Sequence, residues 1–208
     1  MIYLSDDYIS KYSDVLSYLI ARSHDEGYSF DFIQKSISYS IAVNELERSN
    51  VTIFAFSSIE KIYSDIFPMH SNDYELDIYG LFGWVGSAYM LLFLKLEITF
   101  EALFCLIPIE EMINLYHLYH EMDNVKLIAY AKEKMKHSLL DVIMQRKGLS
   151  NKQLSIKTEL SVSTINAIRY GNRDINKLEA NKLLKMARAL NIKMETLLPD
   201  IGLIMQQE

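Results

Sequence analysis

The chain has 208 residues, half of them hydrophobic, which is enough to bury a substantial core and argues against disorder. Its 7 glycines and 3 prolines supply few of the tight turns that an all-β fold needs, so an all-α fold is predicted. The single cysteine, Cys105, excludes an intramolecular disulfide, and the acidic start MIYLSDDYISKYSD is unlike a secretory leader. A cytoplasmic location is therefore expected.

The net charge of −6 is distributed unevenly along the chain. Residues 1–123 carry 6 Lys/Arg against 19 Asp/Glu, a net charge of −13, whereas residues 124–208 carry 15 against 8, a net charge of +7. This asymmetry predicts two domains, of which the basic one binds a polyanion and the acidic one binds something else. The alternative is a solvated charged surface on each half.

Residues 1–123 are expected to be mostly helical. Apolar residues at helical spacing predict helices over residues 6–22, 29–43, 58–66, 81–95, 100–106 and 109–122. A capping box from Ser57 to Glu60 precedes the third helix, and the segment 50–56, NVTIFAF, is the main candidate for a strand. From Asp123 to Lys147 the pattern is compatible with one charged helix that enters the next domain without a flexible linker.

The segment 78–94, IYGLFGWVGSAYMLLFL, has 17 uncharged residues, the minimum for a membrane span. Its glycines and tyrosines favour instead a buried helix with close backbone contacts, and no membrane association is predicted.

The segment HLYHE, residues 117–121, places His117 and His120 on one helix face beside Glu121, a spacing that suits a metal ion. Without a third ligand, polar groups on an amphipathic helix are the favoured interpretation, and no metal is predicted.

The segment 149–171, LSNKQLSIKTELSVSTINAIRYG, has the pattern of two short helices joined by a turn. Ser150 and Gln153 form a capping box for the first helix, Ser161 can cap a second from Val162 to Tyr170, and Gly171 can end it. Helical spacing also marks LLDVIMQRK (139–147), LEANKLLKMARAL (178–190) and METLL (194–198). The result is five helices in about 65 residues, the size of a compact DNA-binding domain.

Residues 137–198 resemble the helix-turn-helix domain of the XRE family, the group of phage Cro and lambda-type repressors. The resemblance is carried by LSNKQLS, LSVSTINAIRYGNRDINK and LLKMARALNIKMETLL. Two residues depart from the family pattern: Glu159 stands where the family usually has glycine at the turn, and Thr158 stands where it has an apolar residue. The resemblance implies a lambda-repressor-like domain, here residues 124–208, that binds a double-stranded DNA operator as a homodimer.

The resemblance also implies roles for individual residues. The predicted base contacts are Val162, Ser163, Asn166 and Ala167, and the predicted phosphate contacts are Asn151, Lys152, Ser161, Thr164, Arg169, Asn172 and Arg173. Val162 and Ala167 suit thymine methyl groups, and Asn166 suits adenine, so a preference for A·T pairs is expected. Arg169 occupies a position where the family often has a buried acid, so a structural role within the domain competes with phosphate contact.

The segment from Asp77 to Asp123 loosely resembles the leading domain of small bacterial XRE-type regulators, several of which belong to toxin-antitoxin or phage-defence systems. This implies an antitoxin-like autorepressor in which the acidic helical domain, residues 1–123, binds a partner protein, a toxin. The alternative is a repressor that senses a small molecule in a pocket of the N-terminal domain. A protein used only for architecture or interaction is a third possibility. No motif for catalysis or cofactor binding occurs, so neither enzymatic activity nor a cofactor is predicted.

Overall fold

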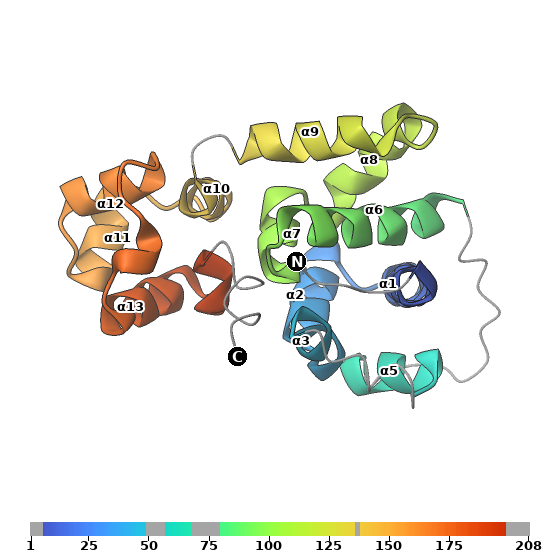
Figure 1. The fold of residues 1–208 in the computed structure, drawn as a ribbon. Helices are drawn as coiled ribbons and strands as arrows, with labels where there is room; N and C mark the ends of the chain where they lie inside the picture. Colours follow the sequence, from blue (N-terminus) through green and yellow to red (C-terminus); the bar gives the residue numbers. More distant parts are fainter. Residues whose placement is uncertain (1–5, 49–56, 68–79, 136–137, 199–208) are drawn as a thin grey trace.

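The computed structural model describes residues 6–48, 57–67, 80–135 and 138–198. These residues form helices with no strand among them, which confirms the all-α fold. The strand predicted within residues 50–56 lies outside the described residues. Figure 1 shows two groups of helices side by side, here called the N-terminal part (α1–α9) and the C-terminal part (α10 to η2).

The helices of the two parts have well-defined bounds. The N-terminal part comprises α1 (Asp6–Asp25), α2 (Phe30–Tyr39), α3 (Ile41–Glu47), α5 (Ile59–Ile66), α6 (Leu81–Leu96), α7 (Phe100–Leu106), α8 (Ile109–Tyr119) and α9 (Asn124–Lys134). The C-terminal part comprises α10 (Leu139–Arg146), α11 (Asn151–Thr158), α12 (Val162–Arg169), α13 (Ala180–Leu190) and the short 3-10 helices η1 (Ile175–Lys177) and η2 (Glu195–Leu197).

Helix α6 is the central helix of the N-terminal part and packs most extensively against α1. Gly86 permits this contact, because a Cβ atom there would lie 2.5 Å from the carbonyl oxygen of Ser13 and 2.7 Å from the backbone nitrogen of Ser17. The prediction of a buried helix with close backbone contacts is therefore confirmed. No helix among the described residues is both long and apolar enough to cross a membrane.

Two of the predicted helices need correction. The helix predicted over 29–43 is interrupted at Ser40, whose extended backbone (ψ 148°) lets its hydroxyl accept a hydrogen bond from the Val43 nitrogen and begin a new helix, α3. The predicted capping box from Ser57 to Glu60 is also wrong: Ser58 caps α5 and accepts from the Lys61 nitrogen. In both cases the serine with extended backbone, rather than the apolar spacing, sets the start.

The helix proposed to run from Asp123 to Lys147 is not continuous. Helix α9 ends at Lys134 and packs on α6 and α8, where the Tyr130 hydroxyl donates to Glu111 Oε1 at 2.6 Å. Ser138 then adopts an extended backbone and caps α10. The helix predicted over 194–198 is only the 3-10 turn η2. The division of the chain at residue 123 stays a prediction.

The two parts meet where α10 packs against α7, and polar side chains also join them. Lys193 Nζ donates to the Ser38 carbonyl oxygen, to Asn44 Oδ1 and to Glu47 Oε2 at 2.9, 3.0 and 3.0 Å. Glu101 Oε2 accepts from the Lys193 nitrogen and the Thr196 hydroxyl at 2.8 and 2.7 Å. Buried apolar residues of both parts also form one cluster, so the parts share a core.

Candidate nucleic-acid interface

Helices α11 and α12 are joined by a tight turn that their own side chains stabilise. Ser150 and Gln153 form the predicted capping box at the start of α11, and Ser161 caps α12. Glu159 takes the left-handed conformation (φ 59°) that the family normally gives to glycine. Thr158 is fully buried at the turn but satisfied, because its hydroxyl donates to the Leu154 carbonyl oxygen at 2.8 Å. The turn thus accommodates a glutamate with positive φ and a buried threonine at the two positions that depart from the family pattern.

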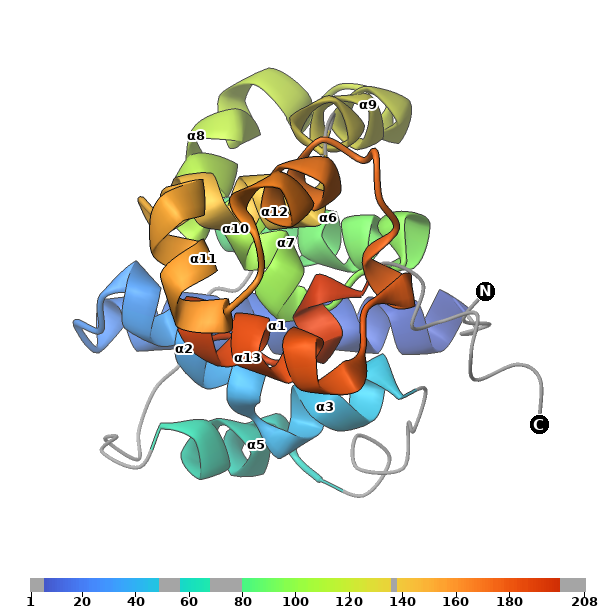
Figure 2. The ribbon, with the colours of Figure 1, turned by 90° about the vertical axis from the view of Figure 1, so that its left-hand side faces the viewer.

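The outer face of α12 carries the residues predicted to contact bases. Figure 2 shows α11, α12 and α13 nearest the viewer, with the helices of the N-terminal part behind them. On α12, Val162 is 42% exposed and Ser163 is exposed, whereas Asn166 and Ala167 are half-buried. Ile165 and Ile168 point inward and are buried. The helix therefore presents one face to solvent and anchors the other in the core.

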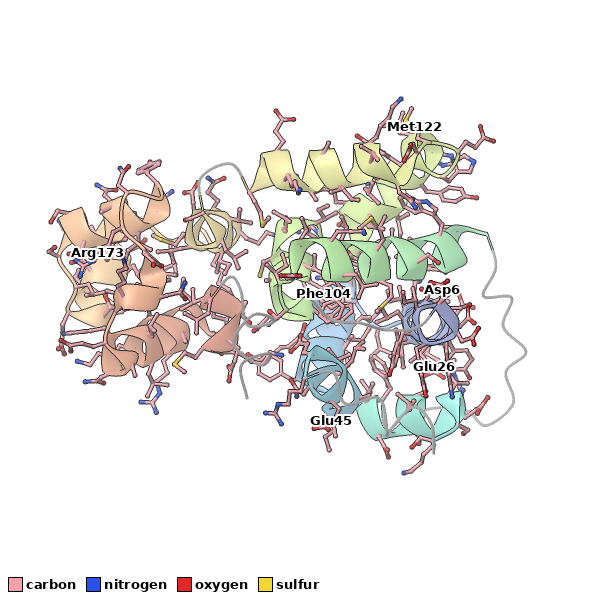
Figure 3. All side chains as sticks on the ribbon, in the orientation of Figure 1. Asp6, Glu26, Glu45, Phe104, Met122 and Arg173 are labelled. Carbon is pink, nitrogen blue, oxygen red and sulfur yellow. The ribbon has the colours of Figure 1, made fainter. Side chains whose placement is uncertain are left out.

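The residues predicted to contact phosphates lie around this face. Lys152, Ser161, Asn172 and Arg173 are exposed, and Thr164 is half-buried. The Ser161 hydroxyl lies 2.9 Å from both the Ser163 and the Thr164 hydroxyls at the start of α12. Figure 3 places Arg173 in the C-terminal part, far from Asp6 and Glu26 of the N-terminal part. Lys152 and Arg173, the two cations among these five residues, are here called the basic rim, and cations and hydroxyls of this kind commonly contact phosphates.

Arg169 points into the C-terminal part. Its side chain is 15% exposed and forms an ion pair with Asp141 of α10, which is itself buried. Its Nη1 atom donates to Asn151 Oδ1 at 2.7 Å. This arrangement favours the structural role among the two that the sequence left open for Arg169. The Asn151 side chain is therefore engaged at both ends, since it accepts from Arg169 and also donates to Asn166 Oδ1.

The ion pair of Asp141 with Arg169 was not predicted from the sequence. Asp141 stands among apolar residues in LLDVIM, which was one signal, and the other was the position of Arg169, where the XRE family often has a buried acid. A carboxylate at a core position requires a cationic or hydrogen-bonding partner. The sequence alone does not say which cation meets it, because the two residues are 28 positions apart.

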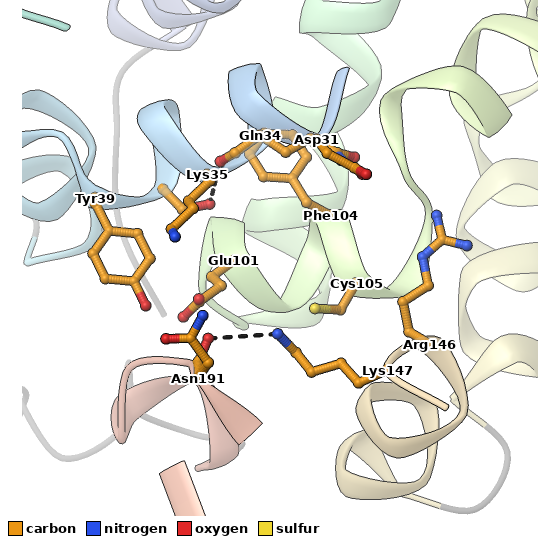
Figure 4. Close-up of a pocket in the computed structure, with 11 residues that line it drawn as sticks. Asp31, Gln34, Lys35, Tyr39, Glu101, Phe104, Cys105, Arg146, Lys147 and Asn191 are labelled. Carbon is orange, nitrogen blue, oxygen red and sulfur yellow. Dashed lines mark hydrogen bonds between the residues drawn. The ribbon is translucent and has the colours of Figure 1, made fainter. Parts of the chain in front are cut away.

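A pocket of about 200 Å³ lies between the two parts, beside the end of α10 (Figure 4). It is lined by residues of α2, α7 and the ends of α10 and α13, including Lys35, Arg146 and Lys147. Among the described residues, none of these three cations forms an ion pair, and Lys147 Nζ only donates to the Asn191 carbonyl oxygen at 3.4 Å. Burial raises the pKa of the adjacent Cys105 thiol to about 11. The carboxylates Asp31 and Glu101 also line the pocket, so its cations exceed its acids by one charge.

The histidines of HLYHE lie at the end of α8. His120 stacks on Tyr116, with ring centroids 4.4 Å apart, and its Nδ1 lies 2.7 Å from the Tyr116 carbonyl oxygen. In the part of the chain that the structure describes, no group of three or more His, Cys, Asp or Glu residues is placed to hold a metal ion.

Comparison with known proteins identifies one segment. Residues 139–201 match the family of Cro/C1-type HTH DNA-binding domains. The match contains α10 to η2 and therefore the complete helix-turn-helix described above. No curated protein and no solved structure matches the chain significantly. The C-terminal part is thus a Cro/C1-type helix-turn-helix domain, as the resemblance to the XRE family implied.

Proposed function

We propose that this chain, whose residues 139–201 match the Cro/C1-type HTH DNA-binding domains, is a sequence-specific transcriptional regulator that binds an operator as a homodimer and represses its own gene. The observation that carries this proposal is the exposed face of α12, beside a basic rim. In this motif the second helix enters the major groove while the first lies across the phosphates. One short helix reads only a few base pairs, so two half-sites bound by a dimer distinguish DNA sequences much better than one.

The proposed base contacts are Val162, Ser163, Asn166 and Ala167, because they form the solvent side of α12. The proposed phosphate contacts are Lys152, Ser161, Thr164, Asn172 and Arg173, with Asn151 at the edge of the interface. Arg169 is assigned to the domain interior rather than to phosphate, because Asp141 and Asn151 already engage its guanidinium group. Phosphate contacts of this kind give register and salt dependence, whereas the residues on α12 give sequence preference.

The N-terminal part is proposed to bind a basic partner protein, as in an antitoxin. Its exposed acidic side chains occur on several helices and loops: Asp6, Asp7, Asp14 and Asp25 of α1, Asp31 of α2, Glu60 and Asp65 of α5, Glu110 of α8, Glu121 and Asp123 before α9, and Glu133 of α9. Such a surface complements a protein that itself binds nucleic acid or nucleotides. Co-expression with the product of the adjacent gene tests the proposal, and a stable complex that survives gel filtration at about 0.3 M salt is expected.

DNA binding is tested by incubating the purified chain with sheared genomic DNA of its source at about 0.15 M salt, where screening suppresses loose backbone binding. Sequencing of the retained DNA is expected to show one palindromic site upstream of the chain's own gene. The variant Ser163→Glu, which adds a negative charge to the face of α12, is expected to abolish the enrichment. A flat profile for the unaltered chain would contradict the proposal.

A sensor of small anions is the second candidate function, and the pocket with Lys35, Arg146 and Lys147 is the observation that favours it. Because the pocket is lined by both parts, an occupant would change how the C-terminal part sits on the N-terminal part. A panel of small carboxylates and phosphates, scored by the shift in melting temperature, tests this function. A shift that disappears in Lys147→Gln would support a sensor, whereas no shift with any compound would leave the partner protein as the favoured ligand.

A further inference from the structure

A line of hydrogen bonds runs from the core of the C-terminal part to the face of α12. Arg169 Nε donates to Asp141 Oδ1 at 2.8 Å, and Arg169 Nη1 donates to Asn151 Oδ1 at 2.7 Å. Asn151 Nδ2 in turn donates to Asn166 Oδ1. The line joins three helices, since Asp141 belongs to α10, Asn151 to α11, and Arg169 and Asn166 to α12.

The donors and acceptors along this line of hydrogen bonds can be arranged in only one way. A guanidinium group donates hydrogen bonds and cannot accept them, so the Asn151 side chain must turn its oxygen toward Arg169. The NH2 group of Asn151 then faces Asn166, whose side-chain oxygen must accept the hydrogen bond. If the Asn166 amide turned over, two NH2 groups would face each other and the hydrogen bond would be lost. The charge of Arg169 therefore fixes the orientation of an amide two contacts away.

The start of the line is held firmly. Asp141 is 3% exposed, and its second oxygen accepts a hydrogen bond from Gln145 Nε2 at 2.7 Å. Hydrogen bonds between charged groups that are shielded from water are strong and geometrically defined. The Ser138 hydroxyl also donates to the Arg169 carbonyl oxygen at 2.8 Å, which fixes the end of α12 against the start of α10. Arg169 thus has little freedom to leave Asn151.

At the other end, the oxygen of Asn166 is engaged by Asn151, and among the described residues no acceptor takes its N–H groups. Asn166 is half-buried on α12, so these donors lie at the edge of the exposed face. In the major groove, guanine presents two neighbouring acceptors, N7 and O6, and thymine presents O4. Adenine presents an acceptor beside an N6 donor, which would meet the donors of Asn166 unfavourably.

We propose that Asp141 and Arg169 set the base preference of α12 without touching DNA, by holding Asn166 as a donor that favours guanine, and secondarily thymine, at one base pair of each half-site. This inference rests on the proposed DNA-binding function and specifies its recognition chemistry. It replaces the expected pairing of Asn166 with adenine. Asp141, Arg169 and Asn151 act as positioning residues, and Asn166 is the one residue of this line that contacts a base.

The variant Asn151→Asp tests the proposal. The new carboxylate still accepts from Arg169, and an acid in the first turn of a helix is favourable, so the domain should fold. It cannot donate to Asn166, whose amide is then expected to turn its N–H groups toward residue 151 and its oxygen toward DNA. Selection from a random DNA library is expected to show the preference at one base pair move by about tenfold from guanine to adenine or cytosine, which present donors.

A matched control separates this effect from charge. Gln153→Glu adds the same negative charge in the same turn and preserves the capping box, so it should weaken binding to all sequences equally. A second variant, Asn166→Asp, presents only acceptors and is expected to shift the same base pair in the same direction. An unchanged sequence profile in Asn151→Asp, with only a uniform loss of affinity, would refute this inference alone. A flat profile for the unaltered chain would refute the proposed DNA-binding function as well.

Discussion

Each part of the molecule buries an arginine paired with a carboxylate, but the two pairs are built differently. In the N-terminal part, Arg22 lies in the last turn of α1 and Glu26 follows directly after this helix, with side chains 4% and 10% exposed. The ring of Tyr63 covers the guanidinium group at 4.4 Å, and the Tyr63 hydroxyl donates to Glu26 at 2.7 Å. In the C-terminal part, the pair of Asp141 with Arg169 joins two helices and continues to Asn151.

The surroundings of the two pairs explain the difference. All of the largest fully buried side chains belong to the N-terminal part, among them Tyr12, Tyr63, Phe67, Tyr89 and Phe100. Such rings supply much buried area, so the pair of Arg22 with Glu26 is one contact among many. The core of the C-terminal part is aliphatic and small, and a single buried ion pair there can fix how α10 and α12 meet. A buried pair is thus local in one part and organises the fold in the other.

The largest effect is expected from breaking the pair in the C-terminal part. Arg169→Met leaves Asp141 buried without its cation, and losing one partner of a buried pair costs about 3–5 kcal/mol of unfolding free energy. Arg22→Met is the matched change in the N-terminal part, where Glu26 keeps its hydrogen bond from Tyr63, and about 2 kcal/mol is expected. Urea unfolding measures both.

DNA binding distinguishes the two variants further. Under the proposed function, Arg169→Met should also lose its preference among DNA sequences, even at urea concentrations where it is still folded. Arg22→Met should keep this preference. The double variant Asp141→Leu with Arg169→Met should recover most of the stability, because apolar residues can replace a buried pair, without recovering the preference. Equal losses of stability in the two single variants would mean that the pairs do not differ in role.

The second prediction concerns the contact of α1 with α6. Gly86→Ala places a methyl group against the backbone of Ser13 and Ser17, so the helices must separate and about 2–3 kcal/mol is expected to be lost. Ser87→Ala, on the exposed side of the same helix, is the control and should change little. Because both parts contribute to one apolar cluster, fluorescence of Trp84 and helical circular dichroism should report a single transition. Two separate transitions would show that the parts unfold independently.

Local signals in the sequence predicted the helix-turn-helix well. The capping and terminating residues act on neighbours within four positions, so their effect can be predicted without knowing the fold. These residues are Ser150, Gln153, Ser161 and Gly171. Glu159 shows how packing overrides local preference, since it adopts a left-handed backbone that glycine adopts more easily.

Contacts between distant residues could not be predicted in the same way. Asp141 meets Arg169 across 28 positions, and Lys193 meets Glu47 across 146. Helical spacing says that a residue points inward but does not say which helix it meets. The break at Ser40 was missed for a related reason, because apolar residues on both sides keep the helical spacing and hide the extended serine between them.

The smallest effect is expected at the polar contact between the two parts, and it should depend on pH. Burial raises the pKa of Glu47 above its ordinary value of 4.5, although Lys193 opposes the shift. An acid with a raised pKa in the folded state favours folding at low pH and loses that contribution as the pH rises. Lys193→Met removes the cation, raises the pKa of Glu47 further and should cost about 2 kcal/mol at pH 7.5, as for a lost hydrogen bond to a charged group. At pH 4.5, where a larger fraction of Glu47 is protonated, the loss should be smaller.

Unfolding free energies of Lys193→Met and the unaltered chain at both pH values measure this difference. Lys185→Met is the control on the same part, because Lys185 pairs with the exposed Glu159 and its removal should change stability little at either pH. An equal loss for Lys193→Met at pH 7.5 and 4.5 would mean that Lys193 stabilises by packing and by its hydrogen bonds to Ser38 and Asn44. A pH-dependent loss would instead show that charge joins the two parts, as it joins α10 to α12.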